Sequence, residues 1–351
     1  MTTAPDRAER TASRAGLART NARRAGGLVL LVACLTLVCL LSVSVGSKSI
    51  PPGTVFEAFS DYSPQHDELF IVRELRLPRT IVAVVVGTAL GVAGALVQAL
   101  TRNPLADPGI LGVNAGAAFM VAIGIGVFGA ASVQSYVWFA FLGALIVTLA
   151  VYLIGSAGRG PTDPVRLTLA GVALGAVLSG ATTGLMLIDP QTFDHMRAWN
   201  AGSVVGRGYG VLLPVVPFIA AGVFIALAVT RSLNAIALGE DLAVAMGARV
   251  RTTRVLGVIA VTLLAGGATA LAGPIGFVGL MIPHAARWIT GPDQRWIFAY
   301  TMIMAPLLLV LSDTLGRIVM RPGELPVGIV TAFVGAPVLI VLVRRKRASG
   351  L

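Results

Sequence analysis

The chain has 351 residues, of which 56% are hydrophobic and 12% charged, and its 27 Lys and Arg against 16 Asp and Glu give a formal net charge of +11. An average soluble domain carries about a quarter charged residues, so this composition excludes a soluble enzyme, a disordered chain and a fibrous repeat. A membrane-spanning helix needs about 20 apolar residues. The sequence therefore predicts an all-α polytopic membrane protein.

The apolar segments, taken in chain order, predict about ten transmembrane helices. They lie at residues 28–45, 79–100, 110–129, 135–155, 165–188, 209–230, 255–272, 277–288, 296–315 and 326–343. Segment 277–288 is too short to cross a bilayer and is predicted to be a half-helix, and the mixed segment 193–206 to be a short re-entrant or surface helix. The first run is long for the apolar part of a signal peptide and no small-x-small cleavage site follows it, so it is predicted to be retained.

Ten spans place both termini on the same side of the membrane. Counted over the loops, 19 Lys and Arg fall on the side of the termini and 8 on the other side. Cytoplasmic loops are enriched in Lys and Arg, so both termini are predicted to be cytoplasmic in a multi-pass protein of the cell membrane. This topology explains the sequence pI of 10.9 without a nucleic-acid partner. The predicted organisation is a basic arm (1–25) that contacts anionic lipid, one membrane domain (26–343) and a basic tail (344–351).

Two parts of the sequence echo each other. Arg79-Thr80 opens one glycine-rich helix and Arg251-Thr252 precedes another, and a stretch rich in Pro and Gly follows each, at 108–112 and at 274–279. The first of these helices is predicted to run inward and the second outward, which is the pattern of an inverted repeat. The alternative is that glycine-rich membrane helices simply look alike.

Glycines four residues apart recur within the predicted spans. Small residues at this spacing let helix backbones approach closely in lipid, so we expect tight packing there, and helices that slide against each other are compatible with it. The pairs are Gly87 and Gly91, Gly112 and Gly116, Gly171 and Gly175, and Gly180 and Gly184.

The spans carry almost no charge that could bind a coupling ion. Asp313 lies near the outer end of the ninth span, whereas an ion-coupled carrier keeps an acidic or histidine side chain at mid-depth despite an insertion cost of about 2.5–3.5 kcal/mol. His66, His195 and His284 have no metal-ligand spacing, and the sequence has no phosphate-binding G-x-x-x-x-G-K-[ST] loop. The energy for uphill transport would therefore enter through a partner.

The inner loop 231–254 contains a candidate docking element for such a partner. Residues 238–247 are predicted to form a short helix, because acidic residues in its first turn favour the positive helix end and Gly247 suits a left-handed stop. Leu242 and Met246 are four residues apart and share one face. A loop helix with an exposed apolar face fits a cytosolic subunit. The alternative is an interfacial helix that lies on lipid.

Five stretches of this sequence match a known pattern in order. They are Arg76-Leu77-Pro78-Arg79-Thr80, then Gln98 with Asn103-Pro104-Leu105-Ala106-Asp107-Pro108, then residues 238–247, then residues 272–284, and finally residues 325–332 with 335–337. Together they resemble the permease subunits of binding-protein-dependent ABC importers of type II, which carry ferric siderophores, haem or cobalamin. The resemblance covers most of the chain, from residue 73 to residue 343, and the order of the motifs makes it highly specific.

This resemblance implies a fold of ten helices in which helices two to five and seven to ten are related by inverted pseudo-symmetry, so that residues 26–343 form one importer domain. It implies a dimer, with a second copy or a paralogue, whose path lies at the subunit interface. Two cytosolic ATPases bind on the inner side and a two-lobed binding protein docks outside. The chain then binds no cofactor and performs no covalent chemistry, since ATP-Mg belongs to the ATPases. Ferric siderophore is the commonest cargo, with haem or cobalamin as alternatives.

The same resemblance assigns roles to outer and inner loop residues. The outer arginines that pair with acidic residues of the binding protein would be Arg76, Arg79 and Arg317. Anchoring to lipid phosphate is the alternative for them. The inner gate would use Asn103 and Leu105, although an Asn-Pro turn can also simply end the second span.

Two further groups of residues take roles by resemblance. The segment that couples to the ATPases would comprise Gly239, Glu240, Asp241, Leu242, Ala243, Met246 and Gly247. Trp199, Gly202 and Ser203 resemble the outer gate and path, and for His284 we expect a structural cap at the end of the half-helix.

Two other functional classes stay open at this stage. One is an ion- or proton-coupled secondary carrier that works alone, and the other is an ion channel or structural membrane scaffold. The missing mid-depth acid and the predicted loop helix both favour the ABC importer. A neighbouring gene for a phosphate-loop ATPase or a lipoprotein-type binding protein would count against both alternatives.

Overall fold

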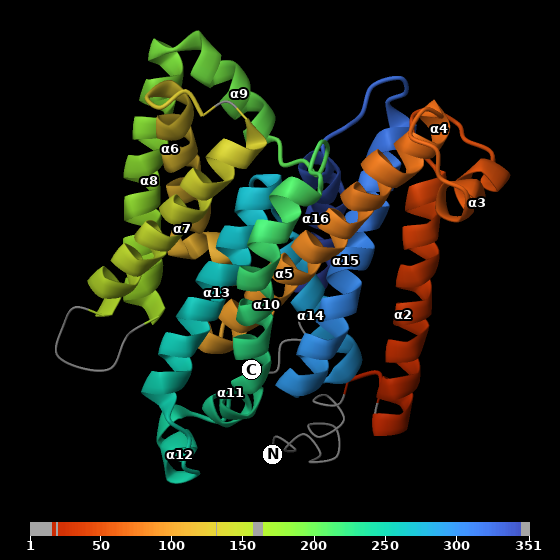
Figure 1. The fold of residues 1–351 in the computed structure, drawn as a ribbon. Coiled ribbons are helices and arrows are strands. Elements are labelled where there is room, and N and C mark those ends of the chain that lie inside the picture. Colours follow the sequence, from red (N-terminus) through yellow and green to blue (C-terminus); the bar gives the residue numbers. More distant parts are fainter. Residues whose placement is uncertain (1–15, 19, 131, 157–163, 345–351) are drawn as a thin grey trace.

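A computed structural model describes residues 16–18, 20–130, 132–156 and 164–344, and within these ranges its regular structure consists of helices joined by loops, without strands (Figure 1). Ten of its helices coincide with the ten predicted spans. They are α2 (Asn21–Ser44), α5 (Leu77–Thr101), α6 (Val113–Gly126), α7 (Val133–Ser156), α8 (Pro164–Ile188), α10 (Tyr209–Ala228), α13 (Val250–Ala272), α14 (Val278–Thr290), α15 (Gln294–Val319) and α16 (Val327–Arg344). The prediction of an all-α fold with about ten membrane helices is confirmed.

Seven of the described helices are long and apolar enough to cross a membrane, and α6 and α16 are shorter apolar helices. Helix α14 has only 13 residues, as expected for the predicted half-helix. Helix α2 begins seven residues earlier than predicted, because the Thr20 hydroxyl accepts a hydrogen bond from the Arg23 amide at 3.3 Å and caps it. Most of the predicted basic arm and tail, 1–15 and 345–351, lies outside the described residues.

Shorter helices gather at the two ends of the bundle. Those at one end are α3 (Pro52–Ser60), α4 (Asp67–Phe70), the π-helix η1 (Ile71–Arg76) and α9 (Pro190–Asn200). Those at the other end are α11 (Thr230–Ile236) and α12 (Glu240–Ala245), at the same end of the bundle as the start of α2 (Figure 1). The 3₁₀ helix η2 (Pro108–Leu111) follows the end of α5. Because α12 carries the predicted coupling segment, we call its end the inner end and the end with α3 the outer end.

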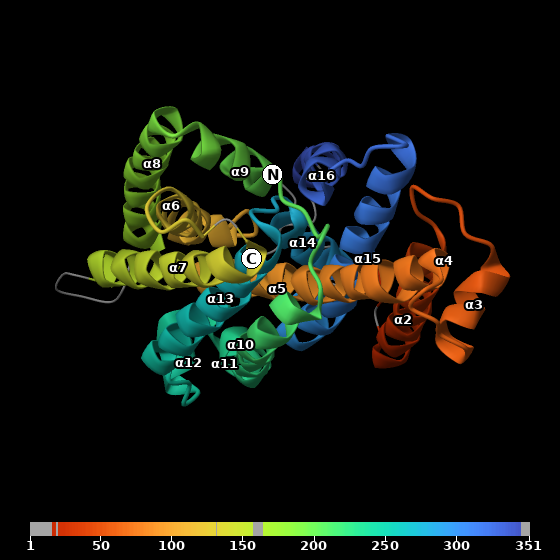
Figure 2. The same ribbon diagram turned by 45° about the horizontal axis from the view of Figure 1, so that its top comes forward.

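The first helix of each predicted repeat, α5 or α13, packs against helices of the other repeat. Helix α5 packs against α14 and α15, and its counterpart α13 packs against α6 and α7 (Figure 2). On α5, the Gln98 amide donates to the carbonyl oxygens of Gly279 and Leu280 at 3.3 and 3.1 Å. On α13, the Thr269 hydroxyl contacts the Asn114 side chain of α6 at 3.0 Å. The second helix of each repeat is therefore bound to the first helix of the other, which supports an inverted repeat over a chance likeness.

Close glycine packing occurs at some of the predicted pairs and not at others. A Cβ placed on Gly91 would lie 2.5 Å from the Ala305 Cβ, and one on Gly87 would lie 2.6 Å from the Pro306 Cα. Gly180 and Gly184 on α8 have no described neighbour within 4 Å of such a Cβ. The first group holds the bundle together within one chain, whereas the α8 pair stays uncovered.

Candidate functional site

The predicted docking arginines are gathered at the outer end but point into the protein. The Arg76 guanidinium donates to the carbonyl oxygens of Val43, Ser44 and Lys48 at 3.1, 2.6 and 2.5 Å. These carbonyls belong to the end of α2 and the loop that follows it. Arg76 therefore closes the outer end of the first span, where the final carbonyls of a helix have no partner inside the helix.

Arg79 and Arg317 share one buried carboxylate. The Arg79 guanidinium donates to Asp313 at 2.8–3.1 Å and to Glu324 at 2.7 Å. Arg317 is only 1% exposed, lies 3.0 Å from the Oδ2 of Asp313, which Arg79 also contacts, and donates to the carbonyl and hydroxyl oxygens of Ser42. A buried charge is tolerated only with partners of this kind. This network joins α2, α5 and α15 at their outer ends.

An outer cavity of about 670 Å³ lies above this network. Five cationic side chains and two acidic ones contribute to its wall, so its charge balance is positive. These residues are Lys48, Arg76, Arg79, Arg207, Arg317, Glu74 and Glu324. The exposed residues Leu75, Gln134 and Val205 also line it, so the cavity opens to the outer face. The structure thus brings the three predicted arginines to one wall and adds Arg207, which the sequence analysis did not single out.

The predicted outer-gate segment ties three helices together. The predicted short helix at 193–206 is found in part, as α9 over residues 190–200, whereas residues 201–206 are not helical. Trp199 near the end of α9 is buried. Gly202 follows with φ +66°, and a Cβ there would lie 2.5 Å from the carbonyl oxygen of Pro274. The Ser203 amide donates to the Ala272 carbonyl at 2.7 Å, and the Gly202 carbonyl accepts from the amide of Gly328 at 3.0 Å. Backbone hydrogen bonds therefore join this segment to the end of α13 and the start of α16.

Asn103 and Leu105 form a compact turn at the inner end of α5. The Asn103 amide donates to the Gln98 carbonyl at 3.2 Å, and its side-chain oxygen accepts from the Leu105 amide at 3.0 Å. This is the turn chemistry expected of Asn at the end of a span. The Leu105 side chain is exposed, so an apolar group projects from the turn at the inner end.

A short helix forms within the predicted segment 238–247, as α12 over residues 240–245. Gly239 and Gly247 lie on either side of it with φ values of +114° and +83°, which favour glycine. Leu242 and Met246 are exposed at 50% and 62%, whereas Ala243 between them is fully buried. Helix α12 thus presents an apolar face away from the chain. Asp241 is exposed as well.

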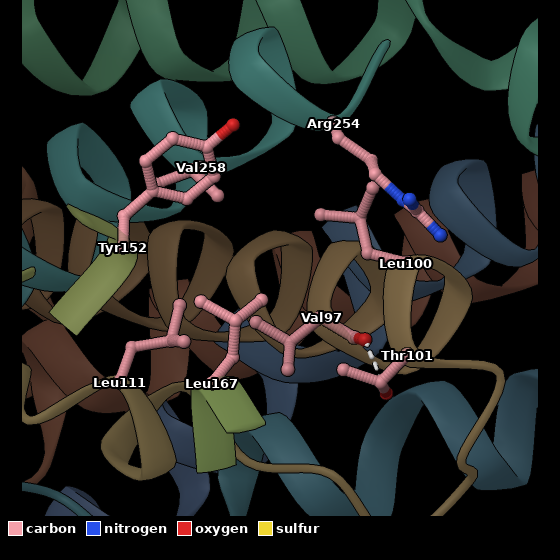
Figure 3. Close-up of a pocket in the computed structure, with 8 residues that line it drawn as sticks. All are labelled: Val97, Leu100, Thr101, Leu111, Tyr152, Leu167, Arg254 and Val258. Atoms are coloured by element: carbon pink, nitrogen blue, oxygen red, sulfur yellow. Dashed lines mark hydrogen bonds between the residues drawn. The ribbon is translucent and has the colours of Figure 1, made fainter. Parts of the chain in front are cut away.

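Glu240, in the first turn of α12, also makes a contact within the chain. Its carboxylate forms an ion pair with Arg254 on α13. The Arg254 side chain lines a small inner cavity of about 40 Å³ together with Leu100 and Thr101, the last residues of α5 (Figure 3). A Cβ on Gly257, one turn along α13, would lie 2.6 Å from a methyl carbon of Leu100. Helix α12 is therefore connected through α13 to the end of α5, where the Asn103 turn begins.

His284 does not cap the half-helix, contrary to the prediction. It lies inside α14, more than one turn before the end, and its buried Nδ1 has no partner among the described residues. Arg287 on the same helix is also buried and lies 3.5 Å from the side-chain oxygen of Gln98. The C-cap is Gly291, whose φ of +83° explains why a glycine ends this helix.

Comparison with known proteins identifies the family of this chain. The FecCD transport family matches residues 34–345. The chain belongs to this family. The ferric enterobactin permease FepD of Escherichia coli K12 is 50% identical over 335 residues, which cover 95% of this chain and 98% of FepD. The siderophore permease YfiZ of Bacillus subtilis 168 is 40% identical over 311 residues, which cover 89% and 93% of the two chains.

A solved structure of the same kind supports this assignment. A metal-chelate type ABC transporter in an inward-facing conformation superposes with a TM-score of 0.80 at 27% identity, covering 92% of this chain and 99% of the other. This FecCD member is therefore a multi-pass ABC importer permease, as the sequence motifs predicted, and not an ion-coupled carrier that works alone.

Proposed function

We propose that this FecCD protein forms the membrane path of a binding-protein-dependent importer for ferric siderophores, with both termini in the cytoplasm. The observation that carries the proposal is the exposed apolar face of α12, held at the inner end by the pair of Glu240 and Arg254. A helix that exposes leucine and methionine to water has an unfavourable free energy unless another surface covers it. A cytosolic ATPase is the partner that an importer of this family requires, and it would hold the ATP-Mg, since this chain has no phosphate-binding loop.

The second permease would pack against α8. This helix is one of the least covered spans, with 11% of its apolar window buried against 78% for the span that contains α5. Gly180 and Gly184 lie on it without described neighbours. Small residues at this spacing are the usual means of close helix contact in lipid, so this face suits the dimer interface and the path.

We propose an importer cycle in which these surfaces act in turn. A loaded two-lobed binding protein docks at the outer cavity lined by Arg76, Arg79 and Arg317. ATP binding closes the two cytosolic subunits, and α12 transmits the movement through Arg254 to the end of α5. The turn of Asn103 and Leu105 would then open or close the inner exit, while the Trp199 to Ser203 segment serves the outer one. The ligand shifts a pre-existing equilibrium between the two open sides.

The proposal that the cargo is a ferric siderophore is based on the relatives, because FepD is named for ferric enterobactin and YfiZ for siderophore transport. The test is uptake of radiolabelled ferric siderophores, haem and cobalamin by iron-limited cells with and without the gene. Loss of one ferric-siderophore signal would support the proposal and name the cargo. Loss of only haem or cobalamin uptake would contradict the cargo and keep the importer.

The coupling surface has its own test. Leu242→Asp places a charge on the exposed face of α12, and we expect it to abolish co-purification of the ATPase while the permease still inserts. Gly247→Pro should do the same, because proline cannot adopt the φ of +83° found there. Arg251→Ala, an exposed change at the same inner end, is the control. Normal ATPase co-purification with both variants would contradict the assignment.

A further inference from the structure

Arg207 is distinguished from the other cations of the outer cavity because its side chain has no hydrogen-bond or ion-pair partner among the described residues. It lies in the loop that joins α9 to α10, between Gly206 and Gly208, and it is 8% exposed. Within the described part of the chain its side chain makes no hydrogen bond or ion pair, and its Nε is buried without an acceptor. Its guanidinium carbon lies 5.9 Å from the centre of the Tyr136 ring, which leaves its hydrogen-bond donors unused.

The other cationic side chains of this cavity are already engaged. Arg79 and Arg317 contact Asp313, and Arg76 contacts three backbone carbonyls. Lys48 pairs with Glu68 at 3.2 Å. Loss of these contacts would leave Arg76, Arg79 and Arg317 as buried charges without partners, so these three side chains are held in the wall of the cavity. Lys48 is exposed, and its pair with Glu68 is a surface ion pair. Arg207 alone among the described lining residues offers a free positive charge.

A buried arginine without an acceptor has an unfavourable free energy, and a carboxylate that meets it restores the lost hydrogen bonds. The planar guanidinium matches a carboxylate in two-point contact. The cavity is large enough for a side chain from outside, carries a positive balance, and opens between exposed residues. These features together describe a socket for an acidic group.

We propose that Arg207 receives a carboxylate side chain of the extracytoplasmic binding protein, whereas Arg76, Arg79 and Arg317 hold the walls of the socket. This inference rests on the proposed importer function. A protein side chain suits the site better than free cargo, because no lining residue comes from α8 or α16. The lining residues come from the α2–α3 loop, η1, the start of α5, the start of α7, the loop before α10, the end of α15 and the loop that follows it. The cavity is therefore separate from the α8 face that we assign to the path.

The test measures the affinity of the purified binding protein for the permease–ATPase complex in nanodiscs, for the wild type and for Arg207→Ala, Arg207→Lys and Arg207→Glu. We expect Arg207→Ala to weaken binding by about tenfold or more and to reduce its dependence on salt. Arg207→Lys keeps the charge without the planar donor pair, so it should lie between the wild type and Arg207→Ala. Arg197→Ala is the matched control, because Arg197 is an outer arginine of α9 with a 74% exposed side chain.

A complementary change identifies the partner group. Single Glu→Arg and Asp→Arg variants of the binding protein are screened against Arg207→Glu, and one of them should restore binding. ATPase co-purification and size-exclusion profiles establish that each permease variant is assembled. If the wild type binds and Arg207→Ala binds equally well, the role of Arg207 is overturned. If the wild-type complex does not bind any extracytoplasmic protein, the proposed importer function itself fails.

Discussion

Arg79 and Asp313 are separated by 234 positions in the sequence, yet the guanidinium of the first donates to the carboxylate of the second at 2.8 Å. The pair joins α5 of one repeat to α15 of the other. The same carboxylate lies 3.0 Å from Arg317, so two buried arginines share Asp313, and Arg79 pairs with Glu324 as well. The arginines expected to act as surface contacts are thus also structural elements of the outer end.

Asp313→Asn should destabilise the permease strongly. The substitution removes the negative charge that Arg79 and Arg317 share, and loss of one partner of a buried pair costs about 3–5 kcal/mol. Thermal unfolding in nanodiscs should show a clear fall in Tm. Asp194→Asn is the control, because the pair of Asp194 and Arg197 is exposed and long at 3.9 Å, and such surface pairs contribute about 0–1 kcal/mol. Equal stability of the two variants would show that the buried network is not needed.

The pair of Glu240 and Arg254 should carry movement from the ATPase into the bundle. Glu240→Arg is expected to lower the stimulation of ATPase activity by the binding protein about fivefold or more, since coupling between sites is commonly 1–3 kcal/mol. ATPase co-purification should persist, because the apolar face of α12 is unchanged. Adding Arg254→Glu should restore much of the stimulation.

Arg251→Glu is the control for this swap, as Arg251 is exposed on the same helix as Arg254. ATPase activity of the reconstituted complex, with and without the binding protein, is the measurement. If the double variant behaves like the sum of its two single variants, the ion pair does not couple the helices.

Gly94→Ala should weaken the packing of α5 against α14. Its new methyl group would meet the carbonyl oxygen of Gly279, a backbone atom that cannot move independently. Overpacking of this kind costs about 1–3 kcal/mol, measured again by thermal unfolding. Gly26→Ala on α2 has open space around it and should be neutral or slightly stabilising, because alanine favours the helix. A neutral result at Gly94 would mean that the two helices separate easily.

Gly180→Cys should cross-link two permease subunits. In a background where Cys34 and Cys39 are replaced by alanine, a short bifunctional maleimide is expected to give a dimer through α8. Leu37→Cys on α2 is equally accessible, with 57% of Leu37 exposed, and should not cross-link. A dimer band from both positions would indicate random collision, and a band from Leu37→Cys alone would place the interface on α2.

Several features of the candidate site follow from local sequence patterns alone. Acidic residues in a first turn and a terminal glycine predict the coupling helix, and α12 forms between the two glycines that flank it. These are interactions between neighbours in sequence, so the local pattern contains them. The start of α2 does not follow in this way, because the threonine that caps it lies outside the apolar run that defines the span.

The partners of the outer arginines cannot be predicted in the same way. Asp313 and Arg317 are four residues apart on one helix, a spacing that could have indicated their pair. Nothing in the sequence connects Arg79 to Asp313, or shows that Arg207 reaches the same cavity without an acceptor. The prediction for His284 is wrong because it assumes that the half-helix stops at residue 288, whereas α14 continues to Thr290.

The sequence by itself determined the membrane class, the ten spans, the expected orientation and the family motifs, because hydrophobic length and flanking charge act along the chain. Only the tertiary structure decided which glycines are in contact, and which of the described arginines that line the outer cavity are paired. Those outcomes depend on how α5, α13 and α15 pack, and packing brings together side chains that the sequence separates by more than 200 positions. Arg207 is a candidate binding residue only because of this packing, which places it in the outer cavity without a described ion-pair partner, beside other cations that are paired.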